Sequence, residues 1–408
     1  MTSAVEGPAR PEVKTTGGVV RGFTRRGVQS WRGIPYAAAP VAERRFRAPG
    51  PVEPWEGVRD GSRFGPVPVQ EVSGEFLGAG KHTPMAEDCL TLNVVTPTAP
   101  APGDAPRPVM VWLYGGAFVV GASSASTYRG YDLVERGDVV YVSVNYRLGA
   151  LGWLDFSSWS TPERPFDANV GLRDQIAALE WVRDNIAAFG GDPDNVTIFG
   201  ESAGAISVTT LMTVPSAAGL FHRAIAESSA PGVAYAPERS RVWSEHFVGF
   251  LPRGADDPVR ALSEAGTDEL LAAARRMRDD LDATPGTLIT APTVDGDLLP
   301  EAPLDAFAAG RSHPVPLIIG TNDTEGRLFE LPRVELDLLV SEPKAEAMFA
   351  ATQPELRDQV MAVYRGAPFR KDLGGDFLFW APSVQVMESH GAGGRVLDRR
   401  LAIGHGGR

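Results

Sequence analysis

Short apolar runs alternate along the chain with polar, glycine-rich and helical segments. Four runs are apolar or β-branched at nearly every position: Val109–Leu113, Val139–Val144, Val196–Phe199 and Pro316–Gly320. Strands without a polar face are typical of a parallel sheet that is buried on both sides. Leu90–Thr96 and Arg223–Glu227 predict two further strands. The pattern therefore predicts an α/β protein with a mostly parallel central sheet covered by helices on both faces.

Helical periodicity appears between and after these strands. Apolar residues recur at three- and four-residue steps within 171–189, and Gly190-Gly191-Asp192-Pro193 ends that predicted helix. A second helix is predicted over Phe377–His390, with a kink or a late start at Pro382, followed by a last strand over Arg395–Ile403.

The remaining segments suggest how the domain is organised. We expect residues 1–12 to form a disordered tail and residues 13–408 to form a single domain. Residues 13–70 carry only short strand signals and predict an irregular layer of strands and loops. Residues 217–310 are richer in helical and loop signals. They are expected to contribute a helical cap over the carboxyl edge of the sheet, where ligands bind in such folds.

Composition narrows the classes of function. The net charge of −12 argues against nucleic acid and anionic membrane surfaces as partners. Cys89 is the only cysteine, which excludes an intrachain disulfide and a cysteine-based metal cluster. The chain shows no apolar run of about 18 residues and no apolar stretch near its start, so we expect a cytoplasmic protein.

The residues with candidate chemistry lie directly after the strand Val196–Phe199. Gly200-Glu201-Ser202-Ala203-Gly204 fits the pattern G-x-S-x-G, and a helix-compatible run follows it. Strand, sharp turn and helix are the context of a nucleophile elbow, in which small residues let strand and helix pass close together. The alternative is a plain Gly-Ser turn that caps a helix. The pattern alone is weak, because about 0.3 such matches are expected by chance in a chain of this composition.

A series of further motifs decides between these two interpretations. They include Gly33-Ile34-Pro35-Tyr36-Ala37, Glu87-Asp88-Cys89-Leu90, Asn145-Tyr146-Arg147-Leu148-Gly149, Phe189-Gly190-Gly191-Asp192-Pro193 and Val294-Asp295-Gly296. In this collinear order the sequence resembles the type-B carboxylesterases, the cholinesterase-like branch of the α/β-hydrolases, and within it the bacterial para-nitrobenzyl-esterase-like enzymes. The resemblance covers about residues 13–390.

The resemblance implies a serine esterase without a metal or cofactor, acting on a small ester. Ser202 would be the nucleophile, and the backbone N–H groups of Gly116, Ala117 and Ala203 would form the oxyanion hole. Glu325 would be the acid, because the family places a glutamate before a glycine here. Asp323 is the rival, and its alternative role is that of a turn or helix-capping residue. Cys89 would be a buried small hydrophobe, since it lacks the partner that it has in disulfide-bonded relatives.

The histidine is where this chain departs from the family. Chain order removes the four histidines before Glu325, and His390 is interpreted as a structural residue at a helix end. His405 lies where the base belongs, but the family's His-x-x-(Glu/Asp)-Leu-Pro-Phe type segment is not present around it. We therefore expect a C-terminally incomplete domain with low activity. The alternatives are a catalytically dead binding protein, or an amidase or thioesterase on the same site.

Overall fold

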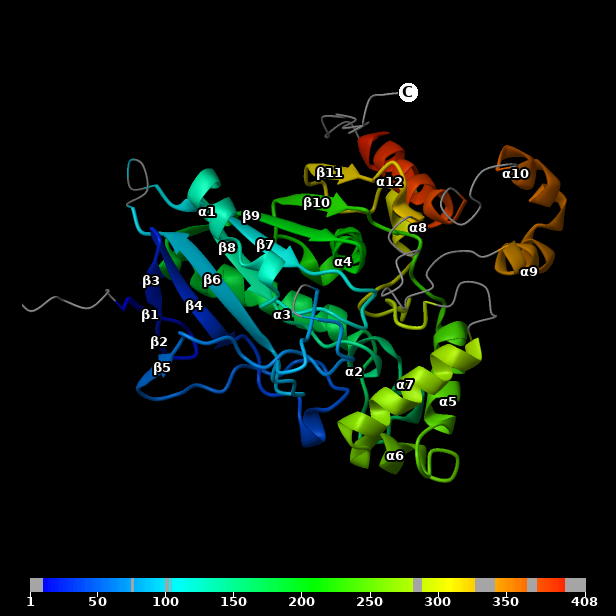
Figure 1. The fold of residues 1–408 in the computed structure, drawn as a ribbon, viewed down its shortest axis with the longest axis horizontal. Coiled ribbons are helices and arrows are strands. Elements are labelled where there is room, and N and C mark those ends of the chain that lie inside the picture. Colours follow the sequence, from blue (N-terminus) through cyan, green and yellow to red (C-terminus); the bar gives the residue numbers. More distant parts are fainter. Residues whose placement is uncertain are drawn as a thin grey trace, which may run out of the picture.

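The structure is a computed structural model. It describes residues 10–74, 77–99, 103, 105–281, 288–326, 342–364 and 373–392. Its centre is an eight-stranded sheet with the strand order β11-β10-β9-β7-β8-β6-β4-β3 (Figure 1). The strands are β3 (Phe23–Arg25), β4 (Val28–Pro35), β6 (Thr91–Pro97), β7 (Arg107–Leu113), β8 (Val140–Val144), β9 (Gly191–Glu201), β10 (Arg223–Glu227) and β11 (Leu317–Gly320).

The five strands from β11 to β8 are parallel to one another, and the other three pair antiparallel. The predicted mostly parallel sheet is therefore confirmed. Every residue of β8 is buried, and so are Val109, Val111 and Leu113 of β7, as expected for strands between two helix layers. The carboxyl ends of β9, β10 and β11 meet at one edge of this sheet.

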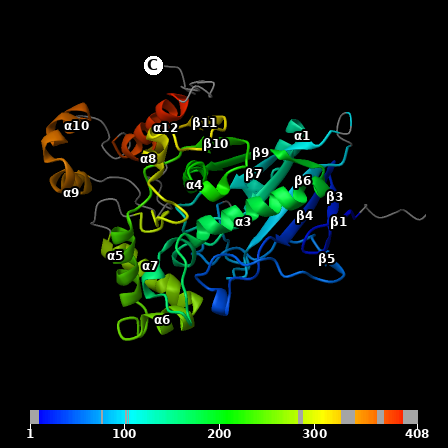
Figure 2. The same ribbon diagram turned by 180° about the vertical axis from the view of Figure 1, so that it is seen from behind.

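Helices cover both faces of the sheet. Helix α1 (Tyr131–Gly137) lies on the face turned toward the viewer in Figure 1. Helices α3 (Val170–Asn185) and α4 (Ala203–Leu211) lie on the opposite face, which Figure 2 turns to the front. Helix α12 (Ala381–Ala392) packs beside α8 (Pro303–Ala308) and β11. The short helix α2 (Ala150–Trp153) packs against α3.

The first part of the chain forms the irregular layer that its short strand signals predict. Strands β1 (Glu12–Lys14), β2 (Val19–Arg21) and β5 (Val58–Asp60) make a separate three-stranded sheet. Cys89 lies near the start of β6 and is 1% exposed, so the expected buried cysteine is confirmed. Burial raises the pKa of its thiol well above the ordinary value, which leaves it an unreactive apolar group.

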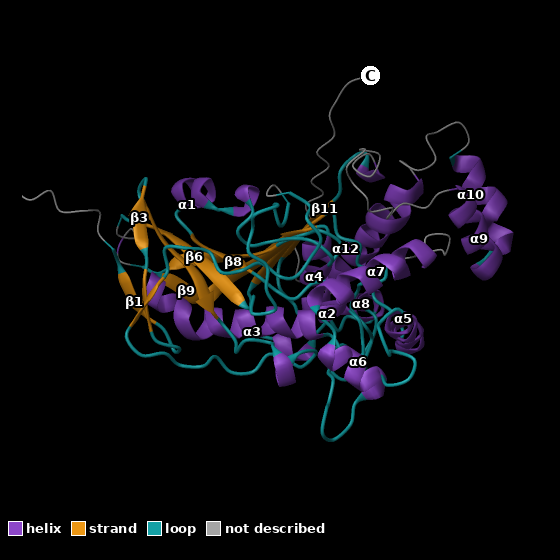
Figure 3. Ribbon diagram, turned by 60° about the horizontal axis from the view of Figure 1, so that its bottom comes forward, coloured by secondary structure: helices purple, strands orange, loops and turns teal. Residues whose placement is uncertain are grey.

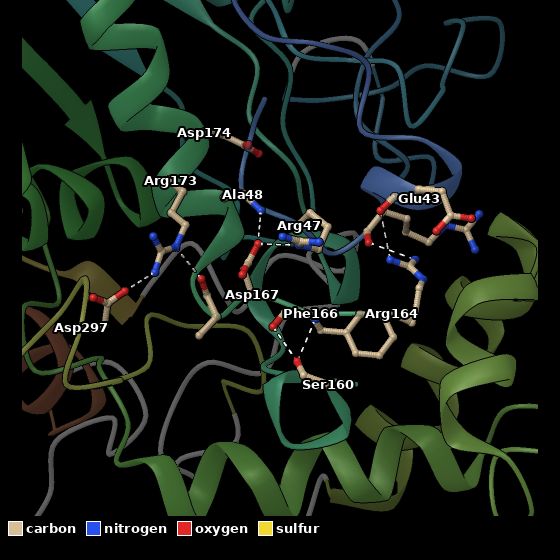
Figure 4. A network of polar contacts seen from close by, with 12 residues as sticks. Glu43, Arg47, Ala48, Ser160, Arg164, Phe166, Asp167, Arg173, Asp174 and Asp297 are labelled. Carbon is tan, nitrogen blue, oxygen red and sulfur yellow. Dashed lines mark hydrogen bonds and ion pairs between the residues drawn. The ribbon is translucent and has the colours of Figure 1, made fainter. Parts of the chain in front are cut away.

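A second apolar core lies beside the sheet. Helices α5 (Pro237–Gly249), α6 (Pro258–Glu264) and α7 (Thr267–Leu281) enclose it, and Phe46 and Phe156 contribute from outside these helices. Figure 3 shows this helical part next to the orange strands. Arg164 connects it to the rest of the chain, because its guanidinium bonds Ser263 of α6 and the carbonyl oxygens of Ala42, Glu43 and Arg45. Figure 4 shows Arg164 beside Glu43.

Three boundaries differ from the expectation or lie beyond it. Strand β9 begins at Gly191 rather than Val196, because Gly191 pairs with Arg107 of β7 ahead of a register shift. The predicted late helix start at Pro382 is wrong, because residues 373–375 are already helical and continue through a π-helical turn at Asp376–Trp380 into α12. The predicted strand Arg395–Ile403 lies outside the described residues. Helices α9 (Glu342–Thr352) and α10 (Arg357–Val363) complete the fold.

Candidate active site

Ser202 lies in the turn between β9 and α4. Its backbone angles are φ 56° and ψ −121°, in the left-handed half of φ that side-chain-bearing residues rarely adopt. Gly200 and Gly204 flank this turn, and both lie close to the backbone of Leu113 at the end of β7. A Cβ on Gly200 would lie 2.7 Å from the carbonyl oxygen of Leu113, and one on Gly204 would lie 2.0 Å from the same oxygen. Only glycine fits at either position, and the serine is left strained at the carboxyl edge of the sheet.

The loop after β7 packs against this serine. A Cβ on Gly115 would lie 3.1 Å from the Cβ of Ser202. The next three residues all have positive φ: Gly116 (114°), Ala117 (54°) and Phe118 (61°). Successive residues of this kind present their N–H groups on one concave side of a loop, which suits an anion.

Every carbonyl of these three residues has a partner. Gly116 O accepts from the backbone N–H of Val119 and Val120 at 3.0 and 3.1 Å, and Phe118 O accepts from Gly149 N at 2.7 Å. Ala117 O accepts from the hydroxyl of Thr290 at 2.9 Å. Across the described residues, the N–H groups of Gly116 and Ala117 have no such partner. Ala203 is the first residue of α4, so its N–H also lacks an intrahelical acceptor.

Tyr114 is the first residue of this loop, and its contacts show why an aromatic residue fits there. Its ring stacks on that of Tyr146 with centroids 4.3 Å apart, and both rings are fully buried. Each hydroxyl donates to the backbone carbonyl of the other residue, at 3.0 Å from Tyr114 and 2.6 Å from Tyr146. The pair anchors the start of the loop to the segment that follows β8.

Glu325 lies in the turn that follows β11, at the same edge of the sheet as Ser202. Its two carboxylate oxygens accept from the backbone N–H and the side-chain amide of Asn322, at 2.6 and 3.3 Å. The Asn322 amide also donates to the hydroxyl of Ser228, which follows β10. Gly375 packs on Glu325, since a Cβ on that glycine would lie 3.3 Å from the Glu325 Cβ. Asp323, the rival acid, is exposed.

A third carboxyl group, that of Glu201, lies beside the serine. Burial, together with the negative charges of Glu325 and Glu227, raises the pKa of Glu201 to about 7. A Cβ on Gly115 would approach the Glu201 carboxylate to 2.8 Å, so this side chain lies under the loop after β7. The carboxyl edge of the sheet therefore gathers a strained serine, neighbouring carboxyl groups and a loop whose N–H groups at Gly116 and Ala117 lack a partner among the described residues.

The described histidines lie elsewhere. His222 and His313 precede β10 and β11, and His390 bonds Val315 just before β11. Because the strands are parallel, these three histidines lie at the edge of the sheet opposite Ser202. His390 is structural as expected, but its partners are Ser312 and Val315 rather than carbonyls of its own helix. His246 pairs with Asp280 of α7, and His82 is exposed in a loop. His405 lies outside the described residues.

The aromatic residues Phe118, Phe377, Phe379 and Trp380 divide between core and surface. Phe118 is fully buried against Trp153, with ring centroids 3.9 Å apart, and Phe379 is 5% exposed within the main core. Phe377 and Trp380 are about half exposed, at 47% and 54%.

Sequence reasoning missed Glu201, Thr290 and Asn322 as members of this region. Glu201 occupies a variable position of G-x-S-x-G, and Thr290 lies in an irregular segment far along the chain. Only Asn322 had a local signal, since it lies in the same turn as Glu325.

Among the described residues, every helix is too short or too polar to span a membrane.

Comparisons with known proteins identify the family of this chain. A family model described as the carboxylesterase family matches residues 9–394. The para-nitrobenzyl esterase of Bacillus subtilis (strain 168) is 40% identical over 375 residues, which cover 91% of this chain and 74% of that protein. The pyrethroid hydrolase Ces2e of Rattus norvegicus is 37% identical over 414 residues, which cover 93% of this chain and 69% of that protein.

Solved structures give the same result. A PNB esterase superposes with a TM-score of 0.82 at 37% identity, covering 95% of this chain and 79% of that one. The Geobacillus stearothermophilus carboxylesterase EST55 at pH 6.2 superposes with a TM-score of 0.80 at 35% identity, covering 97% and 82%. The fold is thus the expected α/β-hydrolase fold. By sequence match and fold, the chain belongs to the carboxylesterase family.

Proposed function

We propose that this carboxylic ester hydrolase forms its acyl-enzyme on Ser202. The Ser202 Oγ attacks the ester carbonyl carbon while its proton passes to a base, and the carbonyl oxygen becomes an oxyanion. Collapse of this intermediate expels the alcohol and leaves an acyl-serine, which water then hydrolyses to the carboxylic acid. The substrate is a small ester, and the proposal needs no metal or cofactor.

The observation that carries the proposal is the strained elbow at Ser202 beside a loop whose N–H groups have no partner in the part of the chain that the structure describes. We assign the oxyanion hole to the backbone N–H groups of Gly116, Ala117 and Ala203. These three donors are held in place, since Ala203 is the first residue of α4 and the carbonyls of the loop residues Gly116, Ala117 and Phe118 are all hydrogen-bonded. Fixed donors stabilise the charge that develops in the transition state, and each is worth roughly 10²–10³ in rate.

We assign Glu325 as the acid that orients and stabilises the protonated base. Its carboxylate is held by two donors from Asn322, and its charge acts on Glu201 next to the nucleophile. Asp323 is exposed in the same turn, which suits a solvated turn residue. His222, His313 and His390 lie at the edge of the sheet opposite Ser202, so the proposal gives them no part in the reaction.

Helices α5, α6 and α7 within residues 217–310 are proposed to form the cap over the site, in a single domain that spans residues 13–408. Their separate apolar core supports a structural unit of its own beside the sheet. A cytoplasmic location stays a prediction from the sequence.

Labelling with a fluorophosphonate tests the nucleophile. The reagent transfers its phosphonyl group to an activated serine, so we expect the wild-type chain to be labelled and Ser202→Ala to be unlabelled. Ser216→Ala changes an exposed serine after α4 and is the matched control, which should label like the wild type. In the same assay, Glu325→Gln should slow labelling and Asp323→Asn should not. Labelling that persists in Ser202→Ala would show that another serine reacts.

A further inference from the structure

Thr290 reaches the proposed oxyanion loop from a distant part of the chain. It lies in the segment that follows α7 and precedes α8, 173 positions beyond Ala117. Its side chain is buried, and its hydroxyl donates to the carbonyl oxygen of Ala117 at 2.9 Å. The other two carbonyls of the positive-φ residues in this loop are held by backbone N–H groups. The Ala117 carbonyl is the one whose described partner is a side chain.

The Ala117 carbonyl matters because Ala117 is strained. Its φ of 54° is unfavourable for a residue with a Cβ, and such a residue keeps that conformation only where its surroundings hold it there. The carbonyl bonded by Thr290 and the N–H proposed as an oxyanion donor belong to the same residue. If the carbonyl is released, Ala117 can relax toward negative φ, and the N–H then turns away from the position of the oxyanion.

Thr290 is itself held in place by its neighbours. Thr293 exchanges two hydrogen bonds with Asn169, its backbone N donating to the Asn169 Oδ1 at 2.8 Å and its carbonyl accepting from the Nδ2 at 2.7 Å. Its hydroxyl also bonds that of Ser240 on α5, at 2.8 Å. This segment is thereby fixed both to the start of α3 and to a helix of the proposed cap, so the Thr290 hydroxyl has little freedom to move.

We propose that Thr290 is a positioning residue for the oxyanion hole: by holding the Ala117 carbonyl, its hydroxyl keeps that residue in its positive-φ conformation, so that the Ala117 N–H stays aimed at the developing charge. The inference rests on the proposed function of the loop. Through Thr290, the segment that leaves the cap also sets the geometry of the hole. Because the oxyanion is absent from the bound substrate and develops only as the serine attacks, losing the hydroxyl should lower the rate of acylation and leave substrate binding unchanged.

The test compares Thr290→Val, which keeps the shape but loses the hydroxyl, with Thr290→Ser, which keeps the hydroxyl. For a 4-nitrophenyl ester we expect Thr290→Val to lower kcat about 10-fold at unchanged KM, less than the roughly 10²–10³ for deleting a donor. The fluorophosphonate labelling rate should fall by a similar factor, and Thr290→Ser should stay within about twofold of the wild type in both assays.

Thr213→Val is the matched control. Thr213 is also buried, and its hydroxyl donates to a backbone carbonyl at 2.8 Å, but it lies after the far end of α4. This variant should keep the wild-type kcat. If Thr290→Val does not fold, Thr290→Cys against Thr290→Ser makes a similar comparison, because the two side chains differ only in the donor atom and a thiol is a weak donor.

Two outcomes overturn the inference, and they can be told apart. If Ser202→Ala abolishes labelling but Thr290→Val behaves like Thr213→Val, the proposed function stands and the role of Thr290 is wrong. If Ser202→Ala is still labelled, the proposed function fails and the role of Thr290 fails with it.

Discussion

Glu201 is the ionisable residue next to the proposed nucleophile, and its position has a consequence for stability. Burial, with the nearby charges of Glu325 and Glu227, raises the pKa of Glu201 from its ordinary value near 4.5 to about 7 in the folded protein. A carboxyl whose pKa is higher in the folded state opposes folding increasingly as the pH rises from the unfolded pKa to the folded one. This penalty is small at pH 5 and complete above about pH 7.

We therefore expect Glu201→Gln to stabilise the protein, by roughly 1 kcal/mol at pH 5 and roughly 3 kcal/mol at pH 8. Denaturant midpoints at the two pH values measure the difference. Glu301→Gln is the control, because Arg311 lowers the pKa of Glu301 and its contribution is already present at pH 5. Equal effects of Glu201→Gln at both pH values would show that the carboxyl is ionised throughout.

Part of this arrangement around Ser202 could be predicted from the sequence. Gly200, Ser202 and Gly204 were predicted because their close approach demands fixed residue types, and such demands leave a pattern. The raised pKa of Glu201 depends on burial, and the bond from Thr290 to Ala117 joins irregular segments far apart in the chain. Neither depends on spacing, so neither leaves a local signal.

At the scale of elements, Arg45 joins the end of α6 to the rest of the protein. Its Nη1 donates to the carbonyls of Leu262, Ser263 and Ala265 at 3.3, 3.2 and 2.8 Å, where a helix end favours a cation. Its other two nitrogens bond both oxygens of Glu87. The side chains of Arg45 and Glu87 are only 12% exposed, so water does not readily replace these bonds.

We expect Arg45→Lys to loosen α6, because an ammonium cannot bond the carboxylate bidentately and the helix end at once. Hydrogen exchange of residues 258–265 should become about 10- to 100-fold faster, which corresponds to roughly 1.5–3 kcal/mol for hydrogen bonds of a charged group. Arg260→Lys alters an exposed pair with Glu264 on the same helix and should leave exchange unchanged. Equal exchange in both variants would contradict a role for Arg45.

The strand boundaries show which features can be predicted from local sequence and which depend on tertiary pairing. The parallel strands β7, β8, β10 and β11 were predicted to within two residues, because continuous apolar runs ended by polar residues mark both ends. Strand β9 extends back to Gly191 through Asp192-Pro193, which have low strand propensity, because pairing with β7 overrides it. Tertiary pairing of this kind cannot be seen in the local pattern.

At the scale of the whole molecule, one buried ion pair links the sheet to its helix layer. The guanidinium of Arg147, in the loop after β8, bonds both carboxylate oxygens of Asp174 on α3, at 2.8 and 2.7 Å. The Arg147 backbone N–H adds a third bond at 3.0 Å. The two side chains are 3% and 0% exposed, so each neutralises the charge of the other away from water.

Removing one partner of such a pair leaves a buried charge without compensation, which costs roughly 3–5 kcal/mol. Asp174→Asn keeps the size of the side chain and should therefore lower the free energy of unfolding by about that amount, a large share of a typical total of about 5–15 kcal/mol. Asp184→Asn also breaks a pair with an arginine, but both side chains are about half exposed, so it should cost less than about 1 kcal/mol. Chemical denaturation of the two variants at neutral pH makes the comparison. Similar losses for both would mean that water reaches Arg147 and that the link between β8 and α3 adds little to global stability.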